Sequence, residues 1–148
     1  MIMQELISSG SKTLKQNQIS TYILDSELIL SNILNESREK IISSYERKVS
    51  KETVFKFNEL LKRRIKNEPM AYIFKKKEFW SKNFLVDAST LIPRPETELL
   101  VEKIVNYFKN KELFFLDIGT GSGCILLSIL GEIKKSYGIG VDISRKAI

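Results

Sequence analysis

Apolar residues recur at helical spacing through the first 66 positions of the chain. In the clearest example Val54, Phe57, Leu61 and Ile65 lie three, four and four positions apart, which predicts one buried face of a helix. Pro69 is expected to end that helix. Other positions predicted on buried helix faces or as N-caps are Ile2, Leu6, Ser9, Leu14, Leu28, Ile29, Leu30, Ile33, Leu34, Ser37 and Ser50. We therefore expect a helical bundle here, with Lys62, Arg63 and Lys66 facing mostly toward water.

The pattern changes between residues 70 and 93. Short aromatic and β-branched runs begin at Tyr72, Glu78 and Asn83, and polar residues separate them. This pattern predicts a β-hairpin or small meander. We interpret residues 69–93 as a linker between a helical domain, 1–68, and a second domain, 94–148.

The second domain begins with a helix and then alternates between strand and helix. Pro95 suits the first turn of a helix that runs to Tyr107 or Phe108. Residues 113–118 form a continuous apolar run, as in a strand buried on both faces, 124–130 an apolar helix, and 137–141 a second strand. Ser144 is expected to cap a further helix. The inward-facing residues predicted for the first helix are Leu100, Ile104, Val105 and Phe108.

A glycine-rich turn joins the first of these strands to the apolar helix. It reads Asp117-Ile118-Gly119-Thr120-Gly121-Ser122-Gly123. Glycines allow sharp turns and close approach of a ligand to the backbone, and the following helix offers free N–H groups. Ligands of open parallel sheets bind at the carboxyl ends of strands, where this turn is expected.

We compare this turn with three kinds of nucleotide-binding site. A P-loop requires Gly-x-x-x-x-Gly-Lys-[Ser/Thr], which the chain does not contain. A dinucleotide fingerprint requires Gly-x-Gly-x-x-Gly, but the third glycine position falls on Cys124 or Leu126. Glycine at every second position, after an acidic residue, is instead typical of S-adenosylmethionine sites. That cofactor has no pyrophosphate, so the carboxylate of Asp117 is tolerated.

Asp142, at the end of the second strand, supports the same hypothesis. An acidic side chain there can accept hydrogen bonds from both hydroxyls of a ribose. In the alternative interpretation, Asp142 merely precedes Ser144 at a helix start, and residues 119–123 form only a tight turn.

Composition narrows the possible chemistry. The chain has no histidine and one cysteine, which excludes Ser-His-Asp and Cys-His nucleophiles, imidazole zinc sites and thiolate cages. No apolar run or signal peptide marks it for a membrane or for export, so we expect a cytoplasmic protein.

Basic residues are concentrated in the front part of the chain. Residues 1–90 hold 16 basic and 11 acidic side chains. Clusters at 62–64 and 75–77 would suit contact with RNA, or they simply form a solvated surface.

Residues 91–100, Leu-Ile-Pro-Arg-Pro-Glu-Thr-Glu-Leu-Leu, resemble the release-factor glutamine methyltransferases. Residues 24–28, 64, 68–69, 71–73, 79 and 84–86 are similar to that family's helical domain and linker, and 117–123 and 141–144 to its cofactor motifs. The resemblance implies an α/β fold class: a small N-terminal helical bundle, a β-hairpin linker, then the start of a Rossmann-like methyltransferase domain, truncated after its second strand.

The family methylates the amide nitrogen of the glutamine in the Gly-Gly-Gln motif of peptide-chain release factors. The resemblance thus implies S-adenosyl-L-methionine as cofactor and release factors as partners, with no nucleic acid or membrane contact. Asp117, Gly119, Thr120, Gly121, Ser122 and Gly123 would hold the methionine end, and Asp142 the ribose. Arg94, Glu96, Thr97 and Glu98 would border the active site, or serve only as a helix start.

The chain departs from the family pattern in two places. Lys75 stands where the family usually has glycine, and the family's Asn-Pro-Pro-Tyr motif, which holds the substrate amide, is not present. We therefore assign no catalytic residue, and expect methyl transfer to need that motif. Two rival hypotheses are a non-catalytic remnant that binds a partner, and a methyltransferase acting on nucleic acid.

Overall fold

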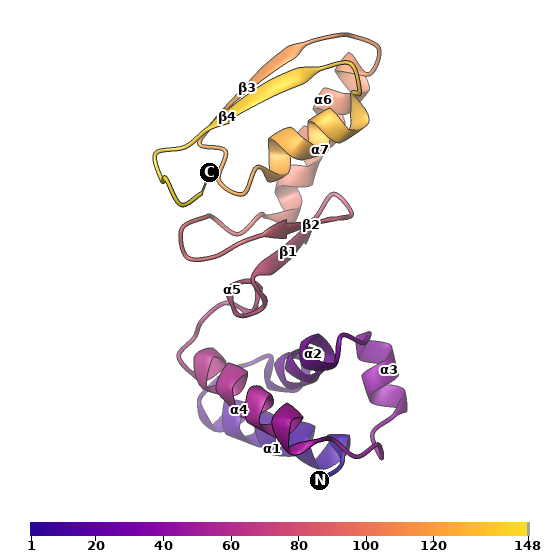
Figure 1. Cartoon of the computed structure of the whole chain (residues 1–148), viewed down its shortest axis with the longest axis vertical. Coiled ribbons are helices and arrows are strands. Elements are labelled where there is room, and N and C mark those ends of the chain that lie inside the picture. Colours follow the sequence, from indigo (N-terminus) through magenta and orange to yellow (C-terminus); the bar gives the residue numbers. More distant parts are fainter. Residues whose placement is uncertain (148) are drawn as a thin grey trace. The chain divides into compact units, whose positions relative to one another are not determined.

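The chain folds into two compact units. The computed structural model describes residues 1–147, and the units are Met1–Phe74 and the residues from Lys75 onward (Figure 1). The first unit is entirely helical, apart from one isolated bridge between Ile2 and Lys48. The second combines helices with two small sheets, so the chain as a whole has mixed α/β structure.

Five helices make up the first unit. They are α1 (Met3–Gln16), α2 (Tyr22–Leu34), α3 (Arg38–Ser43), α4 (Lys51–Ile65) and the short α5 (Met70–Phe74). Two predicted N-caps are confirmed, because the Ser37 hydroxyl accepts the Lys40 N–H and the Ser50 hydroxyl accepts the Thr53 N–H. The helices α1, α2 and α4 pack against one another around a common apolar core.

The buried face of α1 differs from the predicted stripe. Ser9 is exposed, whereas Met3, Ile7 and Gly10 are buried together with Leu6 and Leu14. Gly10 was not predicted because glycine carries no hydrophobic signal. A Cβ built at Gly10 would lie 2.6 Å from the Phe57 ring of α4, so this glycine permits close contact between the two helices.

The core of the first unit also contains charged groups that the apolar pattern did not predict. Asp25 and Glu27 of α2 are 4% and 3% exposed. Arg64 Nε lies 2.7 Å from Asp25 Oδ2, and Arg38 Nε lies 2.7 Å from Glu27 Oε2. The Tyr45 hydroxyl donates a second hydrogen bond to Glu27. Each buried carboxylate is therefore paired, as buried charges must be.

The structure around the α4–α5 corner differs from the predictions in three respects. α4 ends at Ile65, before Pro69, and Asn67 takes a left-handed conformation at φ 61°. Residues 72–74 belong to the helix α5, not to a strand. Arg63 is not simply solvated, because its guanidinium binds Glu68 and donates to the carbonyls of Tyr72 and Ile73.

A hairpin opens the second unit, as the sequence predicted. β1 (Lys76–Phe79) pairs antiparallel with β2 (Lys82–Leu85), with Lys77 opposite Phe84. Phe79 and Phe84 are buried and meet edge to face, with ring centroids 6.2 Å apart. The hairpin thus contributes both aromatic rings to the core of this unit.

A 3₁₀ turn, η1 (Pro95–Thr97), leads into helix α6 (Glu98–Phe108). The predicted inward face is partly wrong. Leu100 is 46% exposed, and the neighbouring Val101 is fully buried. The Glu98 carboxylate accepts the backbone N–H of Trp80 in the hairpin turn, at 2.8 Å, and this bond sets the start of α6 beside the hairpin.

The last part of the second unit is a strand–helix–strand motif. β3 (Phe114–Ile118) pairs parallel with β4 (Tyr137–Val141), and α7 (Cys124–Glu132) connects them. α7 packs against both strands and against α6, and both helices lie on one side of the sheet (Figure 1). The described residues after β4 form a turn, with the Ala147 N–H bonded to the Ser144 carbonyl, and not the predicted helix.

Burial of both faces of β3 was a wrong prediction. Exposed and partly buried residues alternate along both strands of this sheet. Phe114 and Ile118 are 65% and 79% exposed, because α6 and α7 cover only the opposite face. Cross-strand pairing places further apolar side chains on the same open face. They are Leu116, Tyr137, Ile139 and Val141.

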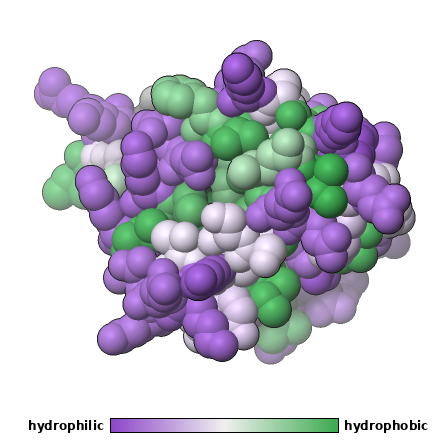
Figure 2. Space-filling view, turned by 90° about the horizontal axis from the view of Figure 1, so that it is seen from below, coloured by the Kyte–Doolittle hydropathy of each residue, from purple (hydrophilic) through white to green (hydrophobic). Residues whose placement is uncertain are grey.

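Elsewhere on the chain, polar and apolar side chains both reach the surface. Figure 2 shows hydrophilic residues over much of the visible face, with hydrophobic ones between them. Within residues 1–147, no helix combines the length and the apolar character needed to cross a bilayer.

Candidate functional site

The glycine-rich turn lies at the carboxyl edge of the β3–β4 pair. Parallel pairing in register sets Asp117 opposite Gly140 and Ile118 opposite Val141, so both strands end at the same edge. The turn begins directly after Ile118, and Asp142 directly follows Val141. Asp117 and Asp142, which are 25 positions apart in the sequence, are thereby brought to the same edge of the sheet.

Backbone hydrogen bonds fix the turn to the end of β4. The N–H groups of Gly119 and Thr120 both donate to the Val141 carbonyl, at 2.8 and 3.0 Å. The Gly123 N–H donates to the Thr120 carbonyl at 2.8 Å, which closes the turn on itself. The loop is therefore anchored at its start and folded compactly before α7.

The three glycines of the turn are required by its backbone. Gly119, Gly121 and Gly123 have φ angles of 80°, 54° and 73°, a region that side chains with a Cβ rarely adopt. A Cβ built on Gly119 or Gly121 would meet no atom within 4 Å. The loop thus presents bare backbone toward open space.

Asp142 lies in direct contact with this loop. The Gly121 N–H donates to Asp142 Oδ2 at 2.8 Å, and the Ser144 N–H donates to Asp142 Oδ1 at 2.9 Å. These bonds, from Ser144 first and then from Gly121, hold the pKa of the Asp142 carboxyl below its ordinary value. The carboxylate is therefore ionised at neutral pH and oriented by two backbone donors.

Asp117 supports the loop from the other strand. The Thr120 hydroxyl donates to Asp117 Oδ2 at 2.8 Å. Asp117 and Asp142 thus bind different parts of the same turn.

Two glycines that sequence reasoning missed allow this close packing. Cβ atoms built on Gly138 and Gly140 of β4 would lie 2.5 Å from Leu126 Cδ1 and 2.7 Å from Thr120 Oγ1. The alternation Gly138-Ile139-Gly140 was the available signal, since it leaves one face of β4 without side chains beneath α7 and the loop.

A hollow of about 570 Å³ lies next to the glycine loop, and Ser122 of the loop and Leu127 of α7 line it. Its walls also include Phe84 and Val86 of the hairpin region, and Lys146 near the end of the described chain. Neither Gly121 nor Asp142 lines it. Beside Ser122, burial raises the pKa of the Cys124 thiol above its ordinary value.

The predicted active-site border has a different set of contacts. Glu98 binds the Trp80 N–H, and the Thr97 N–H closes the 3₁₀ turn on the Arg94 carbonyl. Arg94 and Glu96 are exposed. Among residues 1–147, no hydrogen bond or ion pair joins Arg94, Glu96, Thr97 or Glu98 to the glycine loop.

The basic cluster at 62–64 is neutralised within its own unit. Lys62 pairs with Glu59, and the Arg63 and Arg64 guanidinium groups bind Glu68 and Asp25. This arrangement favours a structural interpretation of the cluster over a nucleic-acid surface.

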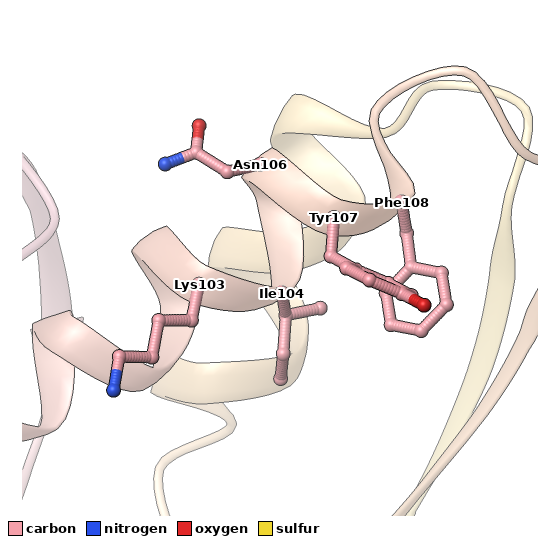
Figure 3. Close-up of a pocket in the computed structure, with 5 residues that line it drawn as sticks. All are labelled: Lys103, Ile104, Asn106, Tyr107 and Phe108. Atoms are coloured by element: carbon pink, nitrogen blue, oxygen red, sulfur yellow. The ribbon is translucent and has the colours of Figure 1, made fainter.

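A second hollow, also about 570 Å³, runs along α6 and away from the glycine loop. Figure 3 shows its lining of Lys103, Ile104, Asn106, Tyr107 and Phe108. The rings of Tyr107 and Phe108 meet edge to face, and Lys111 Nζ lies 5.2 and 5.3 Å from their centroids. None of the predicted site residues lines this hollow, so we do not place the site there.

Fold and site together define a mixed α/β protein. Its bare glycine loop and an ionised aspartate meet at the carboxyl edge of two parallel strands. Residues 5–74 match the family model described as the PrmC N-terminal domain.

Curated relatives extend the match into the second unit. The release factor glutamine methyltransferase of Buchnera aphidicola subsp. Baizongia pistaciae is 44% identical over 84% of this chain and 46% of its own length. Those of Nitratidesulfovibrio vulgaris and Leptospira interrogans are 36% and 39% identical over 99% and 97% of the chain, and 50% and 51% of their own lengths. The chain is thus similar to members of the release factor glutamine methyltransferase family over most of its length. It spans about half the length of the curated relatives it matches.

Proposed function

We propose that the chain contains the cofactor-binding part of a methyltransferase that uses S-adenosyl-L-methionine and acts on the glutamine of the Gly-Gly-Gln motif in peptide-chain release factors. The observation that carries the proposal is the direct contact between Asp142 and Gly121 at the strand ends. The names of the relatives agree with methyl transfer to release factors.

The residues at this edge fit the cofactor. The open space in front of Gly119 and Gly121 admits a ligand against the backbone, without a Cβ in the way. Gly119, Thr120, Gly121, Ser122 and Gly123, with Asp117 behind them, would hold the methionine end. Asp142, ionised and at the neighbouring strand end, would accept the ribose hydroxyls.

The bound cofactor would supply an electrophilic methyl group on its sulfonium. The acceptor is a weak nucleophile, because the lone pair of an amide nitrogen is delocalised into its carbonyl. Catalysis then depends mainly on positioning and electrostatics. In this proposal the described residues bind and orient the cofactor, and Arg94, Glu96, Thr97 and Glu98 border the site from the start of α6.

The helical unit would provide recognition of the release factor. We propose residues 1–68 as the recognition domain, 69–93 as the linker, and 94–148 as part of a Rossmann-like cofactor-binding domain. The helical unit offers exposed apolar side chains for such contact, among them Ile23 and Phe55, which are 51% and 66% exposed.

A methyl-transfer assay tests the function. Because the chain spans about half of its relatives' length, the assay uses a chimera of residues 1–148 joined to the part of the Buchnera relative that the chain does not match. With S-adenosylmethionine labelled on its methyl group, we expect label on a release factor and none on a variant with alanine for the Gly-Gly-Gln glutamine. Label on tRNA in place of the release factor would refute the proposed substrate.

The matched control is the same chimera with Asp142→Ala. We expect it to lose most of the transfer at a cofactor concentration that saturates the parent chimera. Equal transfer by both chimeras would remove Asp142 from the proposed site.

A further inference from the structure

Asp142 connects two segments of the second unit before any ligand is bound. One carboxylate oxygen accepts the Ser144 N–H, two residues away in its own turn, and the other accepts the Gly121 N–H, 21 residues away in the glycine loop. The first bond fixes the orientation of the side chain. The second transmits that orientation to the loop.

Gly121 depends on this side chain more than its neighbours do. The Gly119, Thr120 and Gly123 amides donate to backbone carbonyls, which no side-chain substitution removes. The Gly121 amide donates to the Asp142 carboxylate, in the middle of a turn whose three glycines all have positive φ. Loss of the carboxylate would therefore free the centre of the loop while its start stays anchored.

The acceptor capacity of a carboxylate allows a second role at the same time. Its two oxygens carry about four lone-pair positions. Among residues 1–147, the hydrogen bonds from the Ser144 and Gly121 amides occupy one position on each oxygen, which leaves one on each. A vicinal diol offers two O–H donors, so one side chain can bind the loop and both ribose hydroxyls without exchanging partners.

We infer that Asp142 is a positioning residue of the glycine loop, whose carboxylate fixes Gly121 in the ligand-free chain and keeps one acceptor position on each oxygen for a ribose diol. The diol half of this inference rests on the proposed function, whereas the loop half does not. The loop half distinguishes Asp142 from an aspartate that contacts only the ribose.

The closest substitution, Asp142→Asn, is expected to break this arrangement. An amide has a single acceptor oxygen, so its NH₂ group must face either the Gly121 or the Ser144 N–H. Two donors then oppose each other, and the loop or the turn loses its bond. The substitution preserves size, so packing is left nearly unchanged.

The loop half is tested by amide hydrogen exchange of the ligand-free chain, followed by NMR. In Asp142→Asn we expect the Gly121 amide to exchange about tenfold faster, the loss of roughly one hydrogen bond. The Val101 amide, in the buried part of α6, should not change. The matched control is Asp87→Asn, since Asp87 also accepts a backbone N–H, from Ser89, in a turn outside the loop.

Two exchange results would overturn the inference. Unchanged exchange at Gly121 would show that the carboxylate does not hold the loop. Faster exchange at both Gly121 and Val101 would show that Asp142 supports the whole unit and not the loop in particular.

The diol half is tested by the affinities of S-adenosylmethionine and its 2′,3′-dideoxy analogue. We expect Asp142→Asn to weaken binding of the cofactor about 100-fold and of the analogue about tenfold, because the analogue loses only the loop contribution. An analogue bound equally by both proteins would leave Asp142 as a ribose contact alone. If the unmodified chain binds neither ligand, the proposed function and the diol half fail, while the exchange result still decides the loop half.

Discussion

The two units differ in how completely they bury their apolar residues and pair their charges. In the helical unit Phe57 and Leu14 are fully buried, and the carboxylates of Asp25 and Glu27 have cationic partners. In the second unit one face of the β3–β4 sheet is open, with Phe114, Leu116 and Ile118 at least 60% exposed. Burial of apolar surface is the main favourable term in folding. We therefore expect stability to be concentrated in the helical unit.

The comparison shows that the candidate site does not depend on the larger core. The glycine loop is held by hydrogen bonds to Val141 and Asp142, and by glycines that allow close packing. Substitutions in the helical core and in the loop should therefore have separable effects, the first on unfolding and the second on ligand binding.

The largest expected effect on stability is in the helical core. Phe57→Ala removes a fully buried ring packed against Gly10, and should destabilise the helical unit by about 3–5 kcal/mol. Urea unfolding followed by circular dichroism measures this. The control is Phe55→Ala in the same helix, whose ring is 66% exposed and whose effect should stay within about 0.5 kcal/mol.

The next largest effect concerns the buried ion pair. Arg64→Ala leaves Asp25 buried with an uncompensated charge, and should cost about 3 kcal/mol. Lys62→Ala, which breaks the exposed pair with Glu59, should cost about 0.5 kcal/mol or less. Similar values for the two variants in urea unfolding would contradict the structural difference between these pairs.

A smaller effect is expected from the difference between the core of the second unit and its open sheet face. Val101→Ala, in its core, should cost about 2 kcal/mol, whereas Leu116→Ala on the open sheet face should change stability by less than about 0.5 kcal/mol. Thermal unfolding of both variants measures the difference. A larger loss for Leu116→Ala would mean that this face is covered in solution.

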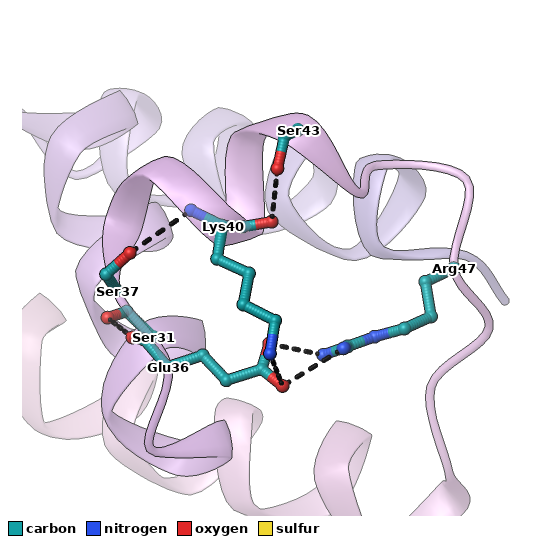
Figure 4. A network of polar contacts seen from close by, with 6 residues as sticks. All are labelled: Ser31, Glu36, Ser37, Lys40, Ser43 and Arg47. Carbon is teal, nitrogen blue, oxygen red and sulfur yellow. Dashed lines mark hydrogen bonds and ion pairs between the residues drawn. The ribbon is translucent and has the colours of Figure 1, made fainter.

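The smallest effect is electrostatic. Figure 4 shows Arg47 and Lys40 around the Glu36 carboxylate. Hydrogen bonding from Arg47 first, and then Lys40, holds the pKa of Glu36 below its ordinary value of 4.5. A lowered pKa stabilises the fold above pH 4.5, and this contribution is lost as the pH falls through the folded-state value.

The Glu36→Gln variant tests that contribution. It should reduce the loss of stability between pH 7 and pH 3, measured by urea unfolding at both values. Glu46→Gln, an exposed residue of the same segment, is the control. An identical pH dependence in Glu36→Gln and the parent chain would show that the ion pairs of Glu36 do not contribute.

Local signals were predictable from the sequence because they depend on few neighbours. The serine caps at 37 and 50, the hairpin and the strand–loop–helix order all follow from short-range rules. Burial was predicted less well, since it depends on tertiary partners. Burial of Asp25 depends on its ion pair with Arg64, which lies 39 positions away in the sequence. The open face of β3 likewise depends on which side of the sheet the helices cover.

The candidate site also combines local features that were predictable with a tertiary contact that was not. The glycine loop and Asp142 were found from spacing, but their direct hydrogen bond could not be, because it depends on the register of β3 with β4. The glycine alternation that includes Gly140 is visible in the sequence, but the contact that requires it, the approach of Thr120, appears only in the structure.

Calorimetric titration of the 148-residue chain with S-adenosylmethionine is the decisive experiment on the site formed by the glycine loop and Asp142. We expect saturable binding at one site, and at least tenfold weaker binding by Asp142→Ala, since a hydrogen-bonded carboxylate at the strand end would be lost. Binding of equal strength by both proteins, or no binding by the parent chain, would contradict this expectation.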